Sequence, residues 1–412
     1  MFQGALRNRA FRLLFGASAV SSLGDRVVPV ALAFAVLNLT GSTTDLGIVL
    51  GAQTVPLVAL LLLGGVWSDR LPRQLVMLSS DAVRATAQGL TAFLLLTGDA
   101  KVWQLAVLQA AYGAADAFFT PASTGLVPQT VAADDLQQAN ALMSLSASAS
   151  AILGPALAGV IVATIGAGWG FAIDAISFVV SAIFLSRLRT DHSARVEASN
   201  TLQDLRSSWQ TFRSHSWLWA IAAFFALFLG LAYSPLQVLG PQICRLFLGG
   251  AGAWAAINVA RGVGSLLGGT LGLRWKPRYP LRTAFMFFLI GAPALLASIA
   301  AHAPLVVIVA FGVLDGITVG VFNTLWFTAV QHRVPADQLS RVAAWDALAA
   351  DTLQPVGQAT SGPVGALLGL SSTLYGAAAL TLVMILAMLG FPAVRHFSYQ
   401  DDDQSSKHLR IA

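Results

Sequence analysis

The chain has 412 residues, of which 56% are hydrophobic and only 10% are charged, and its formal net charge is +5. Soluble globular domains carry roughly a quarter of charged residues, so this composition excludes that class and indicates a protein of the lipid bilayer. The single cysteine, Cys244, excludes a disulfide framework and a cysteine metal cluster. We expect it to be a free thiol in apolar surroundings.

Apolar runs of membrane length recur along the whole chain. A helix that crosses a bilayer needs roughly 20 such residues, and the lack of water in lipid makes runs of this length helical. We expect twelve transmembrane spans, near 13–37, 46–67, 75–97, 103–127, 139–164, 169–187, 217–239, 252–274, 282–300, 304–329, 341–368 and 372–395. The first run is too long for a signal peptide, so we expect it to stay in the mature protein. The fold class predicted is an all-α membrane protein.

The basic residues predict the orientation of the spans. If the amino terminus lies in the cytoplasm, nearly all arginines and lysines outside the spans fall on the cytoplasmic side, and only Lys101 and Arg245 fall outside. This asymmetry follows the positive-inside rule and places both termini in the cytoplasm. We therefore expect a multi-pass protein of the cell membrane, whose positive charge needs no nucleic acid as partner.

A hydrophilic stretch, Ser186–Ser216, divides the spans into six and six, and the two halves match at an offset of about 203 residues. Val131–Leu136 then falls on Val334–Leu339. We expect a six-helix bundle at 1–188, a cytoplasmic linker at 189–215, a second six-helix bundle at 216–396 and a cytoplasmic tail at 397–412. A parallel repeat of six helices typically binds substrate near the midplane, between the halves.

Asp25 and Arg26 lie in the middle of the first span, where charges are expensive and mark transport pathways. The repeat places Phe228 and Leu229 at the matching positions of the second half, so these charges serve a specialised task. Asp25 is our candidate for a carboxyl that titrates during transport, with Arg26 as its regulator and Asp116 of the fourth span as a second coupling residue. The alternative is a structural ion pair between Asp25 and either Arg26 or Arg261.

Polar residues on otherwise apolar helices predict a substrate cavity. In the fourth span Gln109, Tyr112 and Asp116 share one helical face, a spacing that favours an interior, water-filled surface. The second half supplies comparable residues. The candidate cavity residues are Gln109, Tyr112, Asn258, Arg261, Asp315, Phe322, Asn323, Trp326 and Asp351.

Three further charged residues have simpler interpretations. Asp174 lies about two turns from the outer end of a short span, where snorkelling towards water favours a structural role. Asp81 and Arg84 have the spacing of an ion pair within one helix, near its cytoplasmic end. We expect that pair to be structural or gating.

The link between spans two and three contains Gly65, Asp69, Arg70 and Arg73. These residues match the Gly-x-x-x-Asp-Arg-x-Gly-Arg-Arg signature of the major facilitator superfamily, with Pro72 and Gln74 as departures, and the chain resembles that family over essentially its whole length. In the fifth span Gly154, Pro155 and Gly159 resemble the signature of the antiporter branch. The resemblance implies that these link and fifth-span residues gate a conformational change, and that the fold is two pseudo-symmetric six-helix bundles.

One residue departs from the antiporter pattern. That branch usually carries an arginine four residues before a glycine of the fourth span, and before Gly113 this chain has Gln109. Either Arg26 supplies the positive charge, or proton coupling differs from that of the antiporter branch.

A closer resemblance is to the efflux subgroup that includes macrolide exporters and enterobactin-type siderophore exporters. The motifs that carry it are Gly24-Asp25, Phe118–Ala122, Leu136–Ala141 and Ile173–Phe178. The resemblance implies export of a bulky, largely apolar small molecule in exchange for protons, with the proton gradient as energy source, no cofactor and a monomer as the working unit.

Two other functions stay open from the sequence. A nutrient or metabolite importer or facilitator would use the same fold, and a membrane-embedded sensor is a third class. An enzyme would need a nucleophile with a base or a metal cluster. The six histidines lie in loops, tails or near span ends and form no ligand-spaced pair, so we expect neither catalysis nor a metal site.

Overall fold

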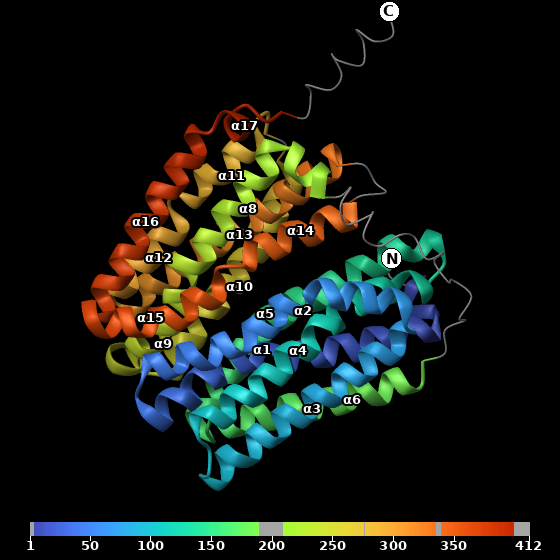
Figure 1. The fold of residues 1–412 in the computed structure, drawn as a ribbon, viewed down its shortest axis with the longest axis horizontal. Helices are drawn as coiled ribbons and strands as arrows, with labels where there is room; N and C mark the ends of the chain where they lie inside the picture. The colour runs from blue at the N-terminus through green and yellow to red at the C-terminus, as the bar shows by residue number, and fades with distance from the viewer. Residues whose placement is uncertain (1–3, 189–208, 276, 335–338, 399–412) are drawn as a thin grey trace, which may run out of the picture.

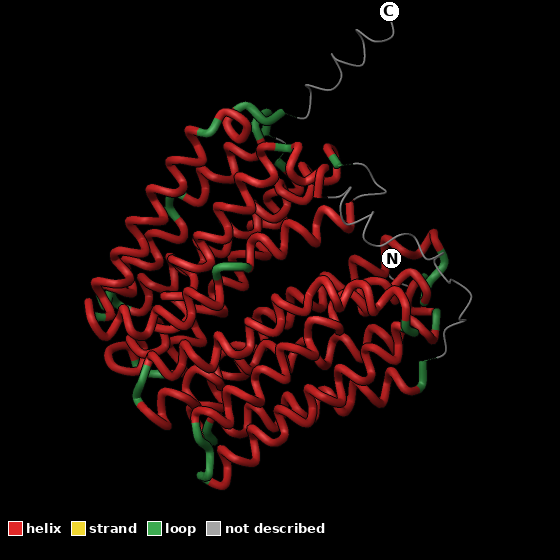
Figure 2. Tube along the Cα trace, in the orientation of Figure 1, coloured by secondary structure: helices red, strands yellow, loops and turns green. Residues whose placement is uncertain are grey.

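The structure is a computed structural model that describes residues 4–188, 209–275, 277–334 and 339–398. Helices fill this part of the chain, and no strand occurs in it (Figure 2). Most of the predicted linker and tail, 189–208 and 399–412, lies outside the described residues. The exact domain boundaries therefore stay a prediction.

The first half consists of six long helices. They are α1 (Arg9–Thr40), α2 (Thr43–Arg70), α3 (Arg73–Thr97), α4 (Val102–Leu126), α5 (Leu136–Thr164) and α6 (Ala167–Ser186). Short 3-10 turns at Ala5–Arg7, Val127–Gln129 and Ala133–Asp135 precede α1 and join α4 to α5. All six predicted spans of this half are confirmed, with ends that differ by a few residues.

The second half repeats the plan with interrupted helices. Its spans are α8 (Ser216–Phe228) continuing through η4 (Leu229–Tyr233), α9 (Ser234–Ile243) and η5 (Cys244–Leu248); α10 (Ala251–Arg274); α11 (Pro280–Phe288) with α12 (Gly291–Ala300); α13 (Leu305–Arg333); α14 (Leu339–Asp351) with α15 (Gln354–Leu368); and α16 (Leu370–Gly390), followed by α17 (Pro392–Arg395). The described residues thus form twelve spans, as predicted. Eight of the helical segments are long and apolar enough to cross a membrane by length and composition alone.

Three spans differ from the sequence prediction. The ninth, expected at 282–300, is interrupted at Leu289 and Ile290. The seventh, expected at 217–239, continues to Leu248 through two π-helical turns, η4 and η5. The eleventh is broken at Thr352 and Leu353, immediately before a helix that has Pro355 in its first turn. Proline lacks an N–H donor and restricts the residue before it, so the break follows from the sequence.

The two halves form a V (Figure 1). We call the end where α1 ends and α2 begins the closed end, and the end where α1 begins the open end. Helix α2 meets α15 near the closed end, where a side chain at Gly47 would lie 2.2 Å from the carbonyl oxygen of Gln358. Helix α5 meets α10, since a Cβ at Gly159 would lie 2.5 Å from that of Ala255. These close contacts hold the halves together between the midplane and the closed end.

Two polar contacts also join the halves at the closed end. Arg245 of η5 donates an Nη1 hydrogen bond to the carbonyl oxygen of Leu37 in the last turn of α1. Gln242 of α9 donates to the carbonyl oxygen of Gly41, at 3.4 Å. The carbonyl end of a helix is negative, so a guanidinium is a favourable partner there. Arg245 is one of the two basic residues that broke the positive-inside pattern, and this contact gives it a role.

The interior of the second half is an aromatic cluster, which we define as Phe224, Phe225, Phe228, Phe285, Phe288 and Phe322. Ring centroids lie 4.9 Å apart for Phe224 and Phe285 and 4.8 Å apart for Phe225 and Phe322, in edge-to-face geometry. Such pairs each add about 0.5–1.5 kcal/mol beyond the burial of their area. The interior of the first half also contains buried charged and polar side chains, and the candidate site lies among them.

Candidate functional site

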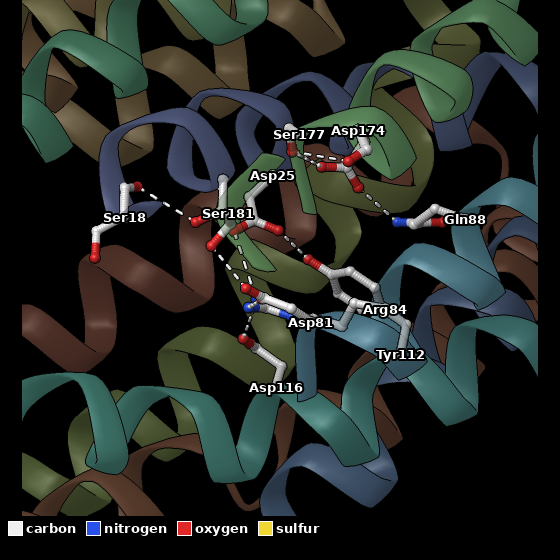
Figure 3. Close-up of polar contacts among 11 residues, drawn as sticks. Ser18, Asp25, Asp81, Arg84, Gln88, Tyr112, Asp116, Asp174, Ser177 and Ser181 are labelled. Carbon is white, nitrogen blue, oxygen red and sulfur yellow. Dashed lines mark hydrogen bonds and ion pairs between the residues drawn. The ribbon is translucent and has the colours of Figure 1, made fainter. Parts of the chain in front are cut away.

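Arg84 of α3 is the centre of the polar interior of the first half (Figure 3). Its Nη2 lies 2.6 Å from Asp81 Oδ1, and its Nη1 lies 3.2 Å from Asp116 Oδ1 and 3.7 Å from Asp25 Oδ2. Three helices, α1, α3 and α4, thus bring carboxyl groups to one buried guanidinium. Asp81 also accepts a hydrogen bond from Ser181 Oγ of α6 at 2.6 Å.

Two aromatic rings fix the plane of this guanidinium. Arg84 Cζ lies 3.9 Å from the ring centroid of Phe119 and 4.3 Å from that of Phe178. A cation over an aromatic face is stabilised by about 0.5–2 kcal/mol, with the larger values in desolvated sites. The rings together with the carboxylates therefore fix Arg84 in position.

Asp25 and Asp116 are the two carboxyls of the group that retain access to solvent. Their side chains are 27% and 31% exposed, whereas that of Asp81 is fully buried. The hydroxyl of Tyr112 donates a hydrogen bond of 2.5 Å to Asp25 Oδ1. In Figure 1 α2 and α5 lie nearest the second half, whereas the two carboxyls come from α1 and α4. The partial exposure of both side chains shows that solvent reaches this part of the first half.

A second polar group continues from Arg84 towards the closed end, and we call it the closed-end arm: Gln88, Gln109, Asp174 and Ser177. Gln109 Nε2 donates to Gln88 Oε1 at 3.1 Å, and Gln88 Nε2 donates to Asp174 Oδ2 at 3.0 Å. Gln88, Gln109 and Asp174 are all fully buried. The snorkelling expected for Asp174 is therefore wrong, because its carboxyl is buried inside the bundle, away from water.

The absence of a side chain at Gly24 makes this arrangement possible. A Cβ there would lie 2.3 Å from Ser177 Oγ and 2.5 Å from Asp174 Oδ1, closer than atoms can approach. The backbone of α1 thus packs directly against the carboxyl of Asp174.

The charge expected from Arg26 is supplied by another residue. Arg26 is exposed, its Cβ lies against Gly154 of α5, and among the described residues no carboxylate forms an ion pair with it. Neighbouring residues of a helix point in different directions, so Arg26 and Asp25 face different surroundings. The alternative pairs are also wrong, because Asp25 pairs with Arg84 and Arg261 pairs with Asp315 at 2.7 Å.

Arg84 and Gln88 are the residues that the sequence interpretation missed. The pairing of Arg84 with Asp81 was expected and is confirmed, but Arg84 lies in the middle of α3, not near a helix end, and reaches two other helices. The available signal was that the fourth span lacks the expected arginine while the adjacent third span contains Arg84. Gln109 faces Gln88 instead of a carboxylate, so α3 provides the cation that α4 lacks.

The structure separates the predicted cavity residues into several environments. Gln109 and Tyr112 are inside the first bundle, and Phe322 and Trp326 pack within and beside the aromatic cluster, with a ring separation of 6.1 Å between them. Asn323 is exposed, Asn258 is partly buried and donates to the carbonyl of Trp254, and Asp351 is partly buried. The structure does not bring these residues together into one lined cavity, and their role stays a prediction.

Arg261 and Asp315 form the charged pair of the second half. Their ion pair lies beside Tyr233, whose ring centroid is 5.2 Å from the Arg261 guanidinium. A small pocket of about 10 Å³, roughly the space of one water molecule, is lined by Phe228, Ala232, Tyr233, Leu236, Arg261, Ala292, Leu295, Leu296 and Asp315. Within the described residues no group of histidine, cysteine and acidic side chains could hold a metal ion.

Of the predicted gating residues, Arg73, Gly154 and Gly159 lie where helices meet. Arg73 donates a hydrogen bond to the carbonyl oxygen of Gly125 at the end of α4. Gly154 packs against the backbone of Arg26 in α1, and Gly159 contacts Ala255 of the other half, so the Gly-Pro segment with Pro155 bears on both bundles. A Cβ at Gly65 would meet no heavy atom within 4 Å, and Gly64 makes the close approach to Ala117 instead. Arg70 is exposed, and the side chain of Asp69 lies outside the described residues.

Comparison with known proteins gives a family. The model of the family described as "Major Facilitator Superfamily" matches residues 14–353. The multidrug efflux pump Tap of Mycolicibacterium fortuitum is 28% identical, over 96% of this chain and 97% of that protein. Macrolide efflux protein A of Streptococcus pyogenes is 22% identical, over 84% of this chain and 87% of that protein. These relatives confirm the resemblance to efflux proteins.

The fold agrees with the family. A variant of the nucleoside transporter NupG superposes with a TM-score of 0.77 at 13% identity, over 93% of this chain and 99% of that one. That likeness concerns the fold alone. With twelve spans, two bundles and a family match over most of its length, the chain belongs to the Major Facilitator Superfamily and is a multi-pass membrane transporter of small molecules, not an enzyme.

Proposed function

We propose that this transporter exports a bulky, largely apolar small molecule across the cell membrane in exchange for protons, by alternating access. The macrolide and multidrug efflux proteins support the direction and the class of substrate. The observation that supports proton coupling is that Asp25 and Asp116, two partly exposed carboxyls, share one buried cation, Arg84. The working unit is a monomer, the proton gradient is the energy source, and no cofactor takes part.

Charge balance explains how Arg84 couples the two carboxyls. Asp81 is the nearest partner of Arg84 and neutralises it, so ionised Asp25 and Asp116 leave an excess of negative charge in a low-dielectric site. A proton on either carboxyl removes part of that excess. A substrate that needs the same surface, or an amine that pairs with the same carboxyl, then competes with the proton. Exchange requires only that proton and substrate favour different conformations.

The conformation in the structure fits one half of such a cycle. With the termini in the cytoplasm, as the positive-inside rule predicts, the closed end faces outwards and the open end faces the cytoplasm. Substrate and the carboxyls then have access from inside. A tenfold proton gradient provides about 1.4 kcal/mol per proton to turn the cycle towards export.

The first experiment identifies compounds. Cells that overexpress the transporter and cells that lack it are compared for sensitivity to macrolides, tetracyclines, phenicols and siderophores. We expect overexpression to raise, and deletion to lower, resistance to at least one bulky apolar compound. Unchanged resistance to the whole panel contradicts export of this class.

The second experiment tests coupling. Proteoliposomes with an imposed pH gradient are loaded with erythromycin, or with ethidium as a second probe, and transport is compared for the wild type, Asp25→Asn and Asp116→Asn. We expect both variants to lose dependence on the gradient while they still exchange probe without one. Two variants that concentrate a probe as the wild type does eliminate the proposed coupling. The exposed Asp99 at the end of α3 provides a matched control, Asp99→Asn.

The alternative is a nutrient or metabolite importer or facilitator on the same fold. Accumulation of a probe inside cells on expression of the protein, driven by the same gradient, would favour it. Exclusion of the probe from cells favours export.

A further inference from the structure

The inference concerns Asp174, a buried carboxyl that the proposed exchange through Asp25 and Asp116 does not use. We propose that Asp174 is a second proton-binding carboxyl, neutral in the conformation seen here, which exchanges its proton with the closed-end side and shares it with Asp25. This rests on the proposed function and adds a second proton site to it.

The contacts of Asp174 favour the neutral acid. Its side chain is fully buried, and no cation lies within ion-pair distance of it in the described part of the chain. A buried carboxylate without a cationic partner is costly. Gln88 Nε2 donates one neutral hydrogen bond to Oδ2, which does not replace the hydration of an ion.

The hydroxyl of Ser177 supports the same protonation state. Its oxygen lies 2.7 Å from the backbone carbonyl oxygen of Asp174 and 3.4 Å from Oδ1 of the same residue. A hydroxyl has one proton to donate, and the shorter contact takes it. The 3.4 Å contact with Oδ1 is longer than an ordinary O–H···O hydrogen bond, so Ser177 does not offer a carboxylate a strong donor, and the neutral acid is favoured.

The surroundings of Asp174 contain the charged groups that its proton would affect. Helix α1 presents Asp25, the residue after Gly24, whose backbone touches the Asp174 carboxyl. Helix α3 presents Arg84 and Asp81, and α4 presents Tyr112, which bonds to Asp25. Helix α5 has no charged residue between Leu136 and Thr164. One arginine thus faces four buried or half-buried carboxyls, and a proton is required on at least one of them to limit the excess charge.

Gln109 marks the route towards the closed end. Its Nε2 is bonded to Gln88, while its Oε1 is buried and has no hydrogen-bond partner among the described residues. Buried polar atoms are normally satisfied by protein or water. When the closed end opens, water that binds Gln109 Oε1 reaches the hydrogen-bonded group that holds Asp174. The carboxyl then exchanges its proton with that water, and a proton that it releases inwards is accepted by the Asp25 carboxylate.

The test uses Asp174→Asn, because asparagine has the shape of the neutral acid and keeps an acceptor for Gln88 but binds no proton. Asp99→Asn is the matched control, with the same substitution at an exposed position in the same half. Asp174→Glu restores a carboxyl. All proteins are reconstituted at full length in lipid.

Two measurements are made. Infrared difference spectra between acidic and alkaline pH report the carbonyl band of protonated buried carboxyls, without any substrate. Proteoliposomes with an entrapped pH dye report the protons moved per erythromycin, with ethidium as second probe. We expect Asp174→Asn to lose part of the infrared band and to lower the ratio of protons to probe, while probe exchange without a gradient persists. Asp174→Glu should recover the ratio, and Asp99→Asn should resemble the wild type.

The outcomes separate this inference from the proposed function. If transport of neither probe by the wild type responds to the pH gradient, the proposed proton exchange fails. If the wild type responds, Asp25→Asn loses the response and Asp174→Asn behaves as Asp99→Asn in both measurements, only the role of Asp174 is overturned. An Asp174→Asn protein that does not fold also overturns it, since the amide reproduces the neutral acid that we assign.

Discussion

The contact of Arg245 with α1 predicts how the closed end is held shut. The Arg245 guanidinium donates to the Leu37 carbonyl oxygen, which also accepts the backbone N–H of Gly41 at 2.9 Å. A hydrogen bond from a charged donor contributes about 1.5–3 kcal/mol. If the contact exists only while the closed end is shut, Arg245→Gln removes about 2 kcal/mol from that state and shifts the ratio of shut to open molecules by about 30-fold.

Spin labels measure that shift directly. Cysteines are placed at the exposed positions Lys101 and Ala301, one in each half at the closed end, in a Cys244→Ser background. Pulsed electron–electron double resonance then gives the distribution of distances between the two spin labels. We expect Arg245→Gln to add a population with a longer distance, and Arg9→Gln, an exposed arginine at the open end, to add none. Equal distributions for the two variants refute the assignment of Arg245 as a closed-end contact.

Three further predictions follow from packing. Gly24→Ala should destabilise the protein by about 1–3 kcal/mol because its Cβ would overlap Ser177 and Asp174. Gly376→Ala, with open space around it, should stabilise its helix by about 0.5–1 kcal/mol. Thermal unfolding in detergent compares the two variants, and equal melting temperatures contradict the packing. Arg84→Met should lower the stability of the fold by about 3–5 kcal/mol because it leaves buried carboxyls unpaired. Arg84→Lys should lower it less, since lysine keeps the charge but not the planar guanidinium or the ring contacts. A methionine variant as stable as the wild type would show that the charges are not paired. Cys244 is buried, so a maleimide should label it only on unfolding; rapid labelling of the folded protein would place the thiol at the surface.

The fold was predictable because each membrane span is a contiguous run of apolar residues in the sequence. Runs of apolar residues, the offset between the halves and the placement of arginines required no knowledge of distant contacts. The interruptions of the second half were less visible: the sequence predicted the seventh span to end near 239, while the helix continues through Pro241 to Leu248 by means of π-helical turns.

The site was predictable only in part, because its partners come from different helices. Spacing showed that Asp81 and Arg84 share a helix face, and the ion pair is there. Spacing could not show that α3 packs so that Arg84 meets Asp25 and Asp116, and the adjacent Arg26 took that role in the sequence interpretation. Asp174 was misjudged for a related reason: distance from a helix end says nothing of which face is turned inwards.

The fixed position of Arg84 has a consequence for the electrical behaviour of transport. A charge that moves across the membrane voltage changes in energy by about 2.3 kcal/mol per 100 mV. Arg84 is held by Asp81, Asp116 and the rings of Phe119 and Phe178, so it contributes no gating current of its own. Only protons and substrate would carry charge through the first half. Exchange of protons for a neutral compound is then driven by voltage as well as pH, whereas exchange of one proton for a singly charged cation is electrically silent.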